Sequence, residues 1–138
     1  MGTRSTIALE FADGSVSQVY CHWDGYLDYN GKILEAHYSN PFTLRDLIDL
    51  GDFSSLRETV EETSEGAYSQ RGGNCQAQRY MNVSEYLVEC QQEEYDYLLR
   101  QVEGQAVWFV RCFATDGAWV MLHEAKALIE RMNESECY

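Results

Sequence analysis

Two β-hairpins constrain the fold of this chain more than any other feature of its sequence. In the first, residues 6–11 alternate between apolar and polar side chains, and a return strand follows over 16–23. Strict alternation is typical of a half-buried strand. The intervening Asp13-Gly14 favours a tight turn, because such turns need positive φ angles at their central residues. A two-residue turn would place Ile7 opposite Tyr20, and a slip by one residue would change every pair.

The second hairpin is expected over 95–113. Aromatic and branched residues, which favour strands, fill 95–102 and 106–113. Glu103-Gly104 lies between these two runs as another tight turn. The two hairpins together predict an antiparallel sheet of four strands.

Apolar residues recur at helical spacing in much of the remaining chain. The first expected helix covers 27–38 and ends at Asn40-Pro41. A short helix that opens at Thr43 follows it, and Asn82 caps a third helix. The last expected helix covers 119–132.

The end of the chain has an alternative interpretation, in which Asp116-Gly117 is a further hairpin turn and 119–122 is a strand. In either case hairpins and helices are segregated along the chain, which defines the α+β class. We expect a four-stranded antiparallel sheet from two hairpins, with three to four helices packed mainly on one face. Residues 1–138 then form a single domain, with a long flexible acidic and polar loop around 57–80.

The chain is strongly acidic, with 23 acidic against 10 basic residues and a formal net charge of −13. Such a surface repels nucleic-acid phosphates and anionic membranes, because lysine and arginine drive binding to both. No apolar run approaches the ~20 residues that span a bilayer. We therefore expect no direct nucleic-acid binding and no membrane association. Solubility alone would explain the charge. The alternative is a carboxylate surface that engages a basic protein, such as one that binds nucleic acid.

Acidic residues gather in two segments of the chain, 46–65 and 85–96. On a helix, Glu85, Glu89 and Glu93 would stack on successive turns, where like charges destabilise the helix by roughly 0.2–0.5 kcal/mol per pair. Nothing local compensates this repulsion, which favours a binding role for the three carboxylates. A solvated helix face is the alternative.

Five cysteines occur without a CxxC pair or another regular spacing. The odd number, and the lack of a secretory leader pattern, predict reduced thiols in a cytosolic chain without a structural zinc site. No glycine-rich phosphate-binding motif occurs either. We therefore expect no cofactor and no metal.

The segment 19–26 concentrates reactive and aromatic side chains at the expected end of a strand, where functional loops are common. Cys21 and His22 are adjacent, so strand alternation places them on opposite faces and argues against a nucleophile-base pair. The candidate binding residues of this loop are His22, Trp23, Asp24 and Tyr26. Arg71 or Arg79, from the long polar loop, would complete a site for a small anionic ligand.

Two runs near the N-terminus, Arg4-Ser5-Thr6-Ile7-Ala8 and Val19-Tyr20-Cys21-His22-Trp23-Asp24-Gly25-Tyr26, are followed by Leu50-Gly51-Asp52-Phe53. Over residues 1–56 this pattern resembles a family of small bacteriophage and prophage proteins. The family carries no assigned catalytic residues. The resemblance implies a viral accessory protein that works in the cytoplasm of its bacterial host.

Three functions are considered, in order of preference. The first is binding and inhibition of a bacterial host protein, such as part of a defence system, through the acidic surface with Trp23 and Tyr26 as apolar anchors. The second is sequestration of a nucleotide signal by the 22–26 loop together with an arginine. The third and least favoured is a hydrolase or transferase that uses His22 and Asp24. A homo-oligomer is compatible with all three.

Overall fold

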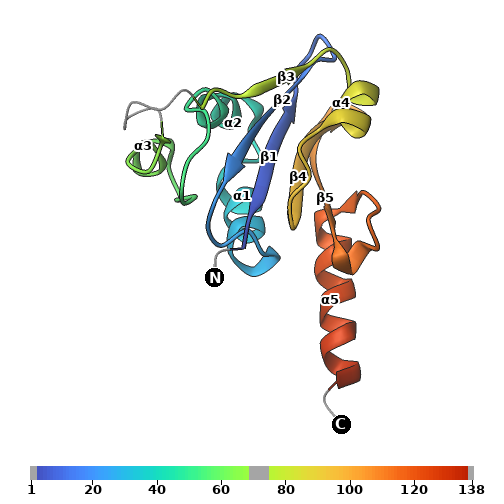
Figure 1. Ribbon diagram of the computed structural model, residues 1–138. Coiled ribbons are helices and arrows are strands. Elements are labelled where there is room, and N and C mark those ends of the chain that lie inside the picture. Colours follow the sequence, from blue (N-terminus) through green and yellow to red (C-terminus); the bar gives the residue numbers. More distant parts are fainter. Residues whose placement is uncertain (1–2, 69–74, 137–138) are drawn as a thin grey trace.

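The computed structural model describes residues 3–68 and 75–136, within which six strands form one mixed sheet in the order β3-β2-β1-β4-β5-β6 (Figure 1). The strands are β1 (Ser5–Glu10), β2 (Val16–Cys21), β3 (Gln78–Tyr80), β4 (Tyr95–Val102), β5 (Gln105–Cys112) and β6 (Val120–Met121). The helices are α1 (Lys32–His37), α2 (Pro41–Ile48), α3 (Val60–Ser64), α4 (Val83–Glu89) and α5 (Leu122–Glu136). A π-helical turn, η1 (Leu27–Gly31), precedes α1, and a 3-10 turn, η3 (Phe113–Thr115), follows β5.

The α+β class is confirmed, but the sheet differs from the four antiparallel strands that the sequence predicts. The two hairpins, β1-β2 and β4-β5, join through a parallel pairing of β1 with β4, in which Ser5 lies opposite Tyr95. The short strands β3 and β6 extend the sheet at its two edges. A parallel pair between segments so distant along the chain leaves no local sequence signal, because turn residues do not connect the two strands.

The first hairpin has a different register from the predicted one. Ile7 lies opposite Val19 rather than Tyr20, because the connection is longer than two residues. The amide of Phe11 donates to Ser15 O at 2.8 Å, and that of Gly14 donates to Phe11 O at 2.9 Å. Only Gly14 of the predicted turn pair has a positive φ, of 90°. Every cross-strand pair is therefore shifted by one residue.

The second hairpin has the predicted two-residue turn. Glu103 and Gly104 have φ angles of 52° and 82°, as a turn with positive φ at both central residues requires. Val102 therefore lies opposite Gln105, and Asp96 lies opposite Arg111.

The helices begin at different residues from those predicted. The 27–38 segment divides into η1 and α1. Asn40 caps α2 by accepting a hydrogen bond from the amide of Phe42 at 2.9 Å, and Pro41 is the first residue of α2 rather than the end of the preceding helix. Thr43 is therefore not the cap. Asn82 caps α4 as predicted, since its side chain accepts from the amide of Glu85 at 2.8 Å.

Both interpretations of the C-terminal segment are partly confirmed. Asp116 and Gly117 have positive φ angles and lead into β6, which pairs with β5, while α5 begins directly afterwards at Leu122. The predicted loop at 57–80 contains α3 and β3, and its residues 69–74 lie outside the described residues.

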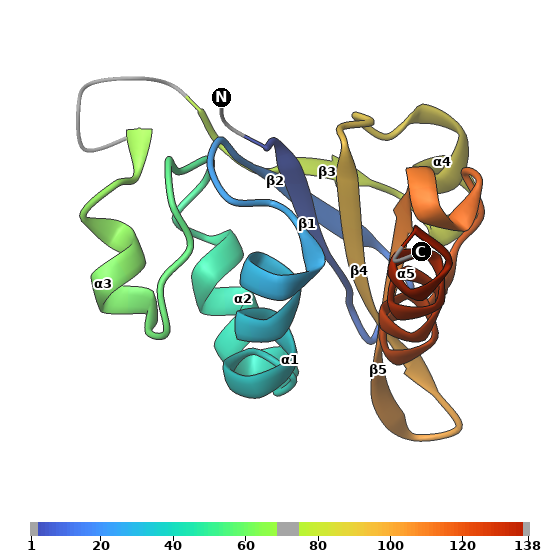
Figure 2. The same ribbon diagram turned by 90° about the horizontal axis from the view of Figure 1, so that it is seen from below.

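The two faces of the sheet are covered unequally. Figure 2 shows α1, α2 and α3 grouped on one side of β1 and β2, with α4 across the sheet from them. Residues that include Ile7, Leu9 and Tyr97 form the larger core with side chains from α1, α2 and α5. The opposite face holds a smaller cluster around Ala8, with Tyr86 of α4. The described residues thus contain five helices rather than the predicted three to four, and α1, α2, α3 and α5 contribute to the larger core.

Candidate functional site

The loop that follows β2 has a backbone fixed by hydrogen bonds to three other segments. The amide of Trp23 donates to Ser54 O at 2.9 Å, and the amide of Gly25 donates to Thr3 O at 2.8 Å. The buried side chain of Asn30 donates to Trp23 O at 3.3 Å. These contacts hold the 22–26 segment, called the aromatic loop below, in one conformation.

Gly25 is the point of closest approach between the aromatic loop and the sheet. A Cβ atom at Gly25 would lie 2.7 Å from the Cβ of Ser5 and 2.9 Å from Thr3 O. The carbonyl of Gly25 also accepts a hydrogen bond of 2.6 Å from the hydroxyl of Tyr97, a core residue of β4. The loop is therefore anchored to the core at a position where any residue other than glycine would force the neighbouring backbone to move.

On this fixed backbone, the large aromatic side chains of the loop reach solvent. Trp23 is 43% exposed and Tyr26 is 40% exposed. The rings of His22 and Trp23 meet edge to face with centroids 4.6 Å apart, and Tyr26 meets Tyr29 in the same way at 6.3 Å. The Tyr26 hydroxyl donates to Asp24 Oδ1 at 3.4 Å. The four candidate residues of this loop thus form two contacting pairs, His22 with Trp23 and Asp24 with Tyr26.

Cys21 and His22 are not paired. The Cys21 side chain is fully buried, and burial raises the pKa of its thiol to about 11. The thiol donates to Trp23 O at 3.4 Å. The His22 Nδ1 atom instead lies 2.8 Å from the Tyr20 hydroxyl. A buried protonated thiol without an adjacent base is not an activated nucleophile.

A series of hollows extends from the aromatic loop past the start of β4. It consists of four adjoining hollows that share lining residues. Asp28 and Lys32 are shared by the first two hollows, and Tyr26 and Tyr95 by the next two. The last two hollows share the pair Glu94 and Phe113. This surface, called the basal groove below, was not predicted, because the parallel pairing of β1 with β4 is what brings its parts together.

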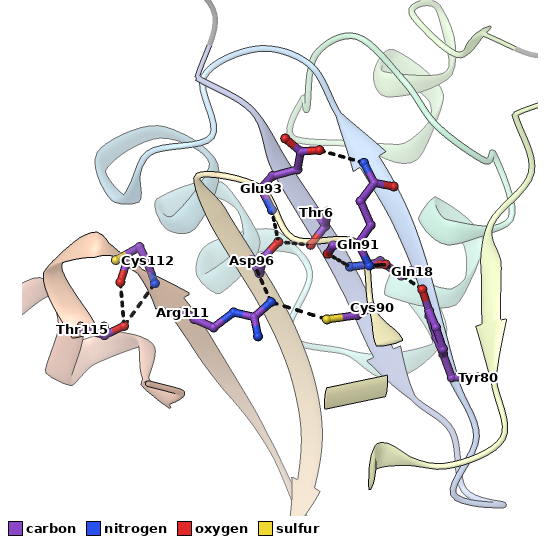
Figure 3. Close-up of polar contacts among 10 residues, drawn as sticks. All are labelled: Thr6, Gln18, Tyr80, Cys90, Gln91, Glu93, Asp96, Arg111, Cys112 and Thr115. Atoms are coloured by element: carbon purple, nitrogen blue, oxygen red, sulfur yellow. Dashed lines mark hydrogen bonds and ion pairs between the residues drawn. The ribbon is translucent and has the colours of Figure 1, made fainter. Parts of the chain in front are cut away.

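Asp96 and Arg111 form a buried ion pair beside the last hollow of the groove (Figure 3). The Arg111 Nη2 atom donates to Asp96 Oδ2 at 3.0 Å and to the Cys90 sulfur at 3.4 Å. Asp96 Oδ1 accepts from the Thr6 hydroxyl at 2.7 Å and from the amide of Glu93 at 3.1 Å. Burial raises the pKa of the Asp96 carboxyl, against these donors. Asp96, within the acidic segment 85–96, therefore has a structural role.

The predicted stack of three glutamates does not exist, because α4 ends at Glu89. Glu93 lies in the following loop, where its carboxylate accepts from the side chain of Gln91 at 2.9 Å. Glu85 accepts from the amide of Met81 at 2.9 Å, which completes the cap of α4. Glu89 is exposed to solvent. The three carboxylates thus have separate environments.

Arg79, one of the two arginines expected to assist the aromatic loop, does not lie beside it. Arg79 lies on β3 opposite Ser17, five residues along β2 from His22, which is ~16 Å of extended strand. Its guanidinium contacts the Ser15 hydroxyl at 3.3 Å and lies 5.7 Å from the ring centroid of Phe11. Arg71 lies outside the described residues.

Comparisons with protein-family models, with curated proteins and with solved structures find no match to this chain. Within 3–68 and 75–136, no group of three histidine, cysteine or acidic side chains is arranged to hold a metal ion. No helix in the same part of the chain has the length and apolar character needed to cross a membrane.

Proposed function

We propose that this chain is a phage accessory protein that binds a bacterial host protein and inhibits it. The observation that carries the proposal is the aromatic loop, whose backbone is fixed while Trp23 and Tyr26 remain 43% and 40% exposed. The resemblance of residues 1–56 to small phage proteins supplies the biological setting. A component of a bacterial defence system fits this setting as the target.

The geometry of the aromatic loop suits protein recognition for two reasons. Tryptophan and tyrosine dominate the binding energy of protein interfaces when they are buried by a partner. Their ordering on binding costs little here, because the loop is already held in place. A catalytic role is less well supported, since His22 is engaged by Tyr20 and the neighbouring thiol is buried.

The charge of the chain favours a basic partner. A net charge of −13 raises the rate of encounter with a positively charged surface and weakens binding to anionic ones. Two exposed carboxylates lie close to the aromatic loop. Asp28 belongs to η1, and Glu94 belongs to the loop before β4. A nucleic-acid-binding host protein would present the complementary surface.

The proposal is tested by capture of the host protein and by measurement of its affinity. The tagged chain is incubated with a bacterial lysate, the captured protein is purified, and its Kd and activity are measured with wild type and with Trp23→Ala/Tyr26→Ala. Loss of two anchor side chains is expected to raise Kd by ~30-fold or more and to abolish inhibition.

Phe42→Ala provides the matched control, since Phe42 is an exposed aromatic residue on α2, outside the aromatic loop. Its Kd should equal that of wild type. Equal affinity of the double variant and wild type would refute the proposal.

Sequestration of a nucleotide signal is a second candidate, favoured by a cleft away from the aromatic loop. Arg45 and Arg79 both line this cleft of about 650 Å³, beside Phe11, and such a volume suits a small ligand. Asp13 and Asp49 also line it and oppose an anion. Thermal shift of the purified chain with a panel of cyclic and linear nucleotides tests this candidate. Stabilisation lost in Arg79→Gln would support it, and no stabilisation by any nucleotide would remove it.

A further inference from the structure

The basal groove has the lining expected of a site for an extended peptide segment. It passes four hollows in succession rather than closing around one cavity. The aromatic residues along it are Tyr29, Tyr26, Tyr95 and Phe113, of which Phe113 is 71% exposed. Side chains of an extended segment that point to alternate sides enter such successive hollows.

The charges along the groove are predominantly negative. The carboxylates that line it outside the buried ion pair are Asp28, Glu58, Glu62, Glu93, Glu94 and Glu130. Two of its four cations are already neutralised, because Lys126 Nζ contacts Glu35 Oε1 at 2.9 Å and Arg111 contacts Asp96 at 3.0 Å. Lys32 and Arg57 remain against the six carboxylates.

A hydrogen-bond donor also lies unused at the end of the groove. Arg111 lines the last hollow and is only 9% exposed, yet its Nε atom has no hydrogen-bond partner among the described residues. The guanidinium of Arg111 lies over the Trp119 ring, 4.8 Å from its centroid, and its Nε atom is buried beneath the surface. Recognition in the groove therefore depends on the carboxylates and the aromatic residues that line it.

We infer that the basal groove binds an arginine-rich extended segment of the host protein. This inference rests on the proposed function, since it names the part of the partner that the groove receives. Arginine fits better than lysine, because the planar guanidinium stacks on tyrosine and phenylalanine faces and pairs with carboxylates through two parallel hydrogen bonds. The carboxylates supply attraction at long range, and the aromatic residues supply selectivity at contact.

The test uses synthetic peptides and the purified chain, so that no captured host protein is needed. A fluorescent peptide of about nine residues, ~30 Å long when extended, alternates arginine with glycine, and a second replaces every arginine with lysine. Fluorescence anisotropy measures both affinities. The arginine peptide should bind about tenfold more tightly than the lysine peptide.

Two exposed residues of the groove that lie outside the aromatic loop provide the variants. Phe113→Ala and Glu94→Gln together should weaken binding of the arginine peptide about tenfold, while Phe42→Ala leaves it unchanged. Equal binding of the two peptides, or full affinity of the Phe113→Ala/Glu94→Gln variant, would overturn the inference. Self-association lost in Phe113→Ala, without peptide binding, would assign the groove to a second copy of the chain.

The outcomes separate the two claims. Capture of a host protein that depends on Trp23, combined with no preference for the arginine peptide, would leave the proposed function standing and refute the groove inference. Arginine-selective binding without a captured host protein would establish the groove and refute the proposed role of the aromatic loop.

Discussion

Asp96 has no contact with solvent, and three donors hold its carboxylate, of which Arg111 alone carries a charge. Replacement of Asp96 by Ala leaves the guanidinium of Arg111 buried without a counter-charge. The free energy of unfolding should fall by about 3–5 kcal/mol, measured by urea denaturation.

The ion pair between Glu10 of β1 and Arg100 of β4 is a control, because Arg100 is 39% exposed. Glu10→Ala should cost less than about 1 kcal/mol. Equal stability losses in Asp96→Ala and Glu10→Ala would show that burial does not set the strength of these pairs.

The buried thiol of Cys21 should make stability depend on alkaline pH. Burial raises its pKa from an ordinary value of 9.0 to about 11, so the folded chain retains a proton that the unfolded chain releases between these values. The contribution is fully present below about pH 9 and is lost as pH rises towards 11; it amounts to about 3 kcal/mol.

Cys21→Ala isolates this contribution, because buried tyrosines such as Tyr97, whose pKa burial also raises, are present in both proteins. The unfolding free energy of wild type should fall more steeply between pH 9 and 11 than that of the variant. Parallel slopes would mean that the thiol does not titrate as its burial predicts.

The turn of the second hairpin offers a test at the scale of an element. Gly104 has a φ of 82°, and a Cβ atom there would meet nothing within 4 Å, so Gly104→Ala measures backbone strain alone, about 1 kcal/mol. Gly51 has a φ of 77°, but its Cβ would also clash with the carbonyl oxygen of Cys75. Gly51→Ala should therefore destabilise the chain by more than Gly104→Ala in urea denaturation. The reverse order would contradict the described path of the 75–77 segment.

Local signals predicted the hairpins better than they predicted their assembly. The Glu103-Gly104 turn and its register follow from two adjacent residues, and so would the buried pair of Asp96 with Arg111, which lie opposite each other in that register. The register predicted from the Asp13-Gly14 turn was wrong by one residue. Asp13 Oδ1 accepts from the amide of Ser15 at 2.9 Å and stabilises a longer connection.

One part of the candidate site could likewise be predicted from local sequence and the other could not. The aromatic loop follows directly from a strand end and a glycine, so its exposed Trp23 and Tyr26 were predictable. The basal groove was not, since Phe113 and Tyr26 meet only through the parallel pairing of β1 with β4. The prediction of a glutamate stack was wrong because α4 ends at Glu89, one turn before Glu93.

At the scale of the whole molecule, a net charge of −13 should destabilise the compact state by self-repulsion. Salt screens exposed charges, since the Debye length falls from ~30 Å at 0.01 M to ~8 Å at 0.15 M ionic strength. The midpoint of urea unfolding should therefore rise between these two conditions. A midpoint that falls with salt would show that attractive ion pairs outweigh the repulsion.

The same screening should weaken association with a basic partner. The Kd for the captured host protein is expected to rise steadily with ionic strength, mainly through slower association. Trp23→Ala should raise Kd without changing this salt dependence, because the indole carries no charge. An affinity independent of salt would show that the carboxylates do not contribute to binding.

The role of the aromatic loop as a protein-binding surface is tested most directly by site-specific photo-crosslinking in bacteria that express the chain. A benzophenone amino acid replaces Tyr26 in one variant and Phe42, which is more exposed than Tyr26 and lies on α2, in the other. The expected result is one dominant crosslinked host protein from position 26 and none from position 42. No crosslink from position 26, or the same host protein crosslinked equally from both positions, would contradict it.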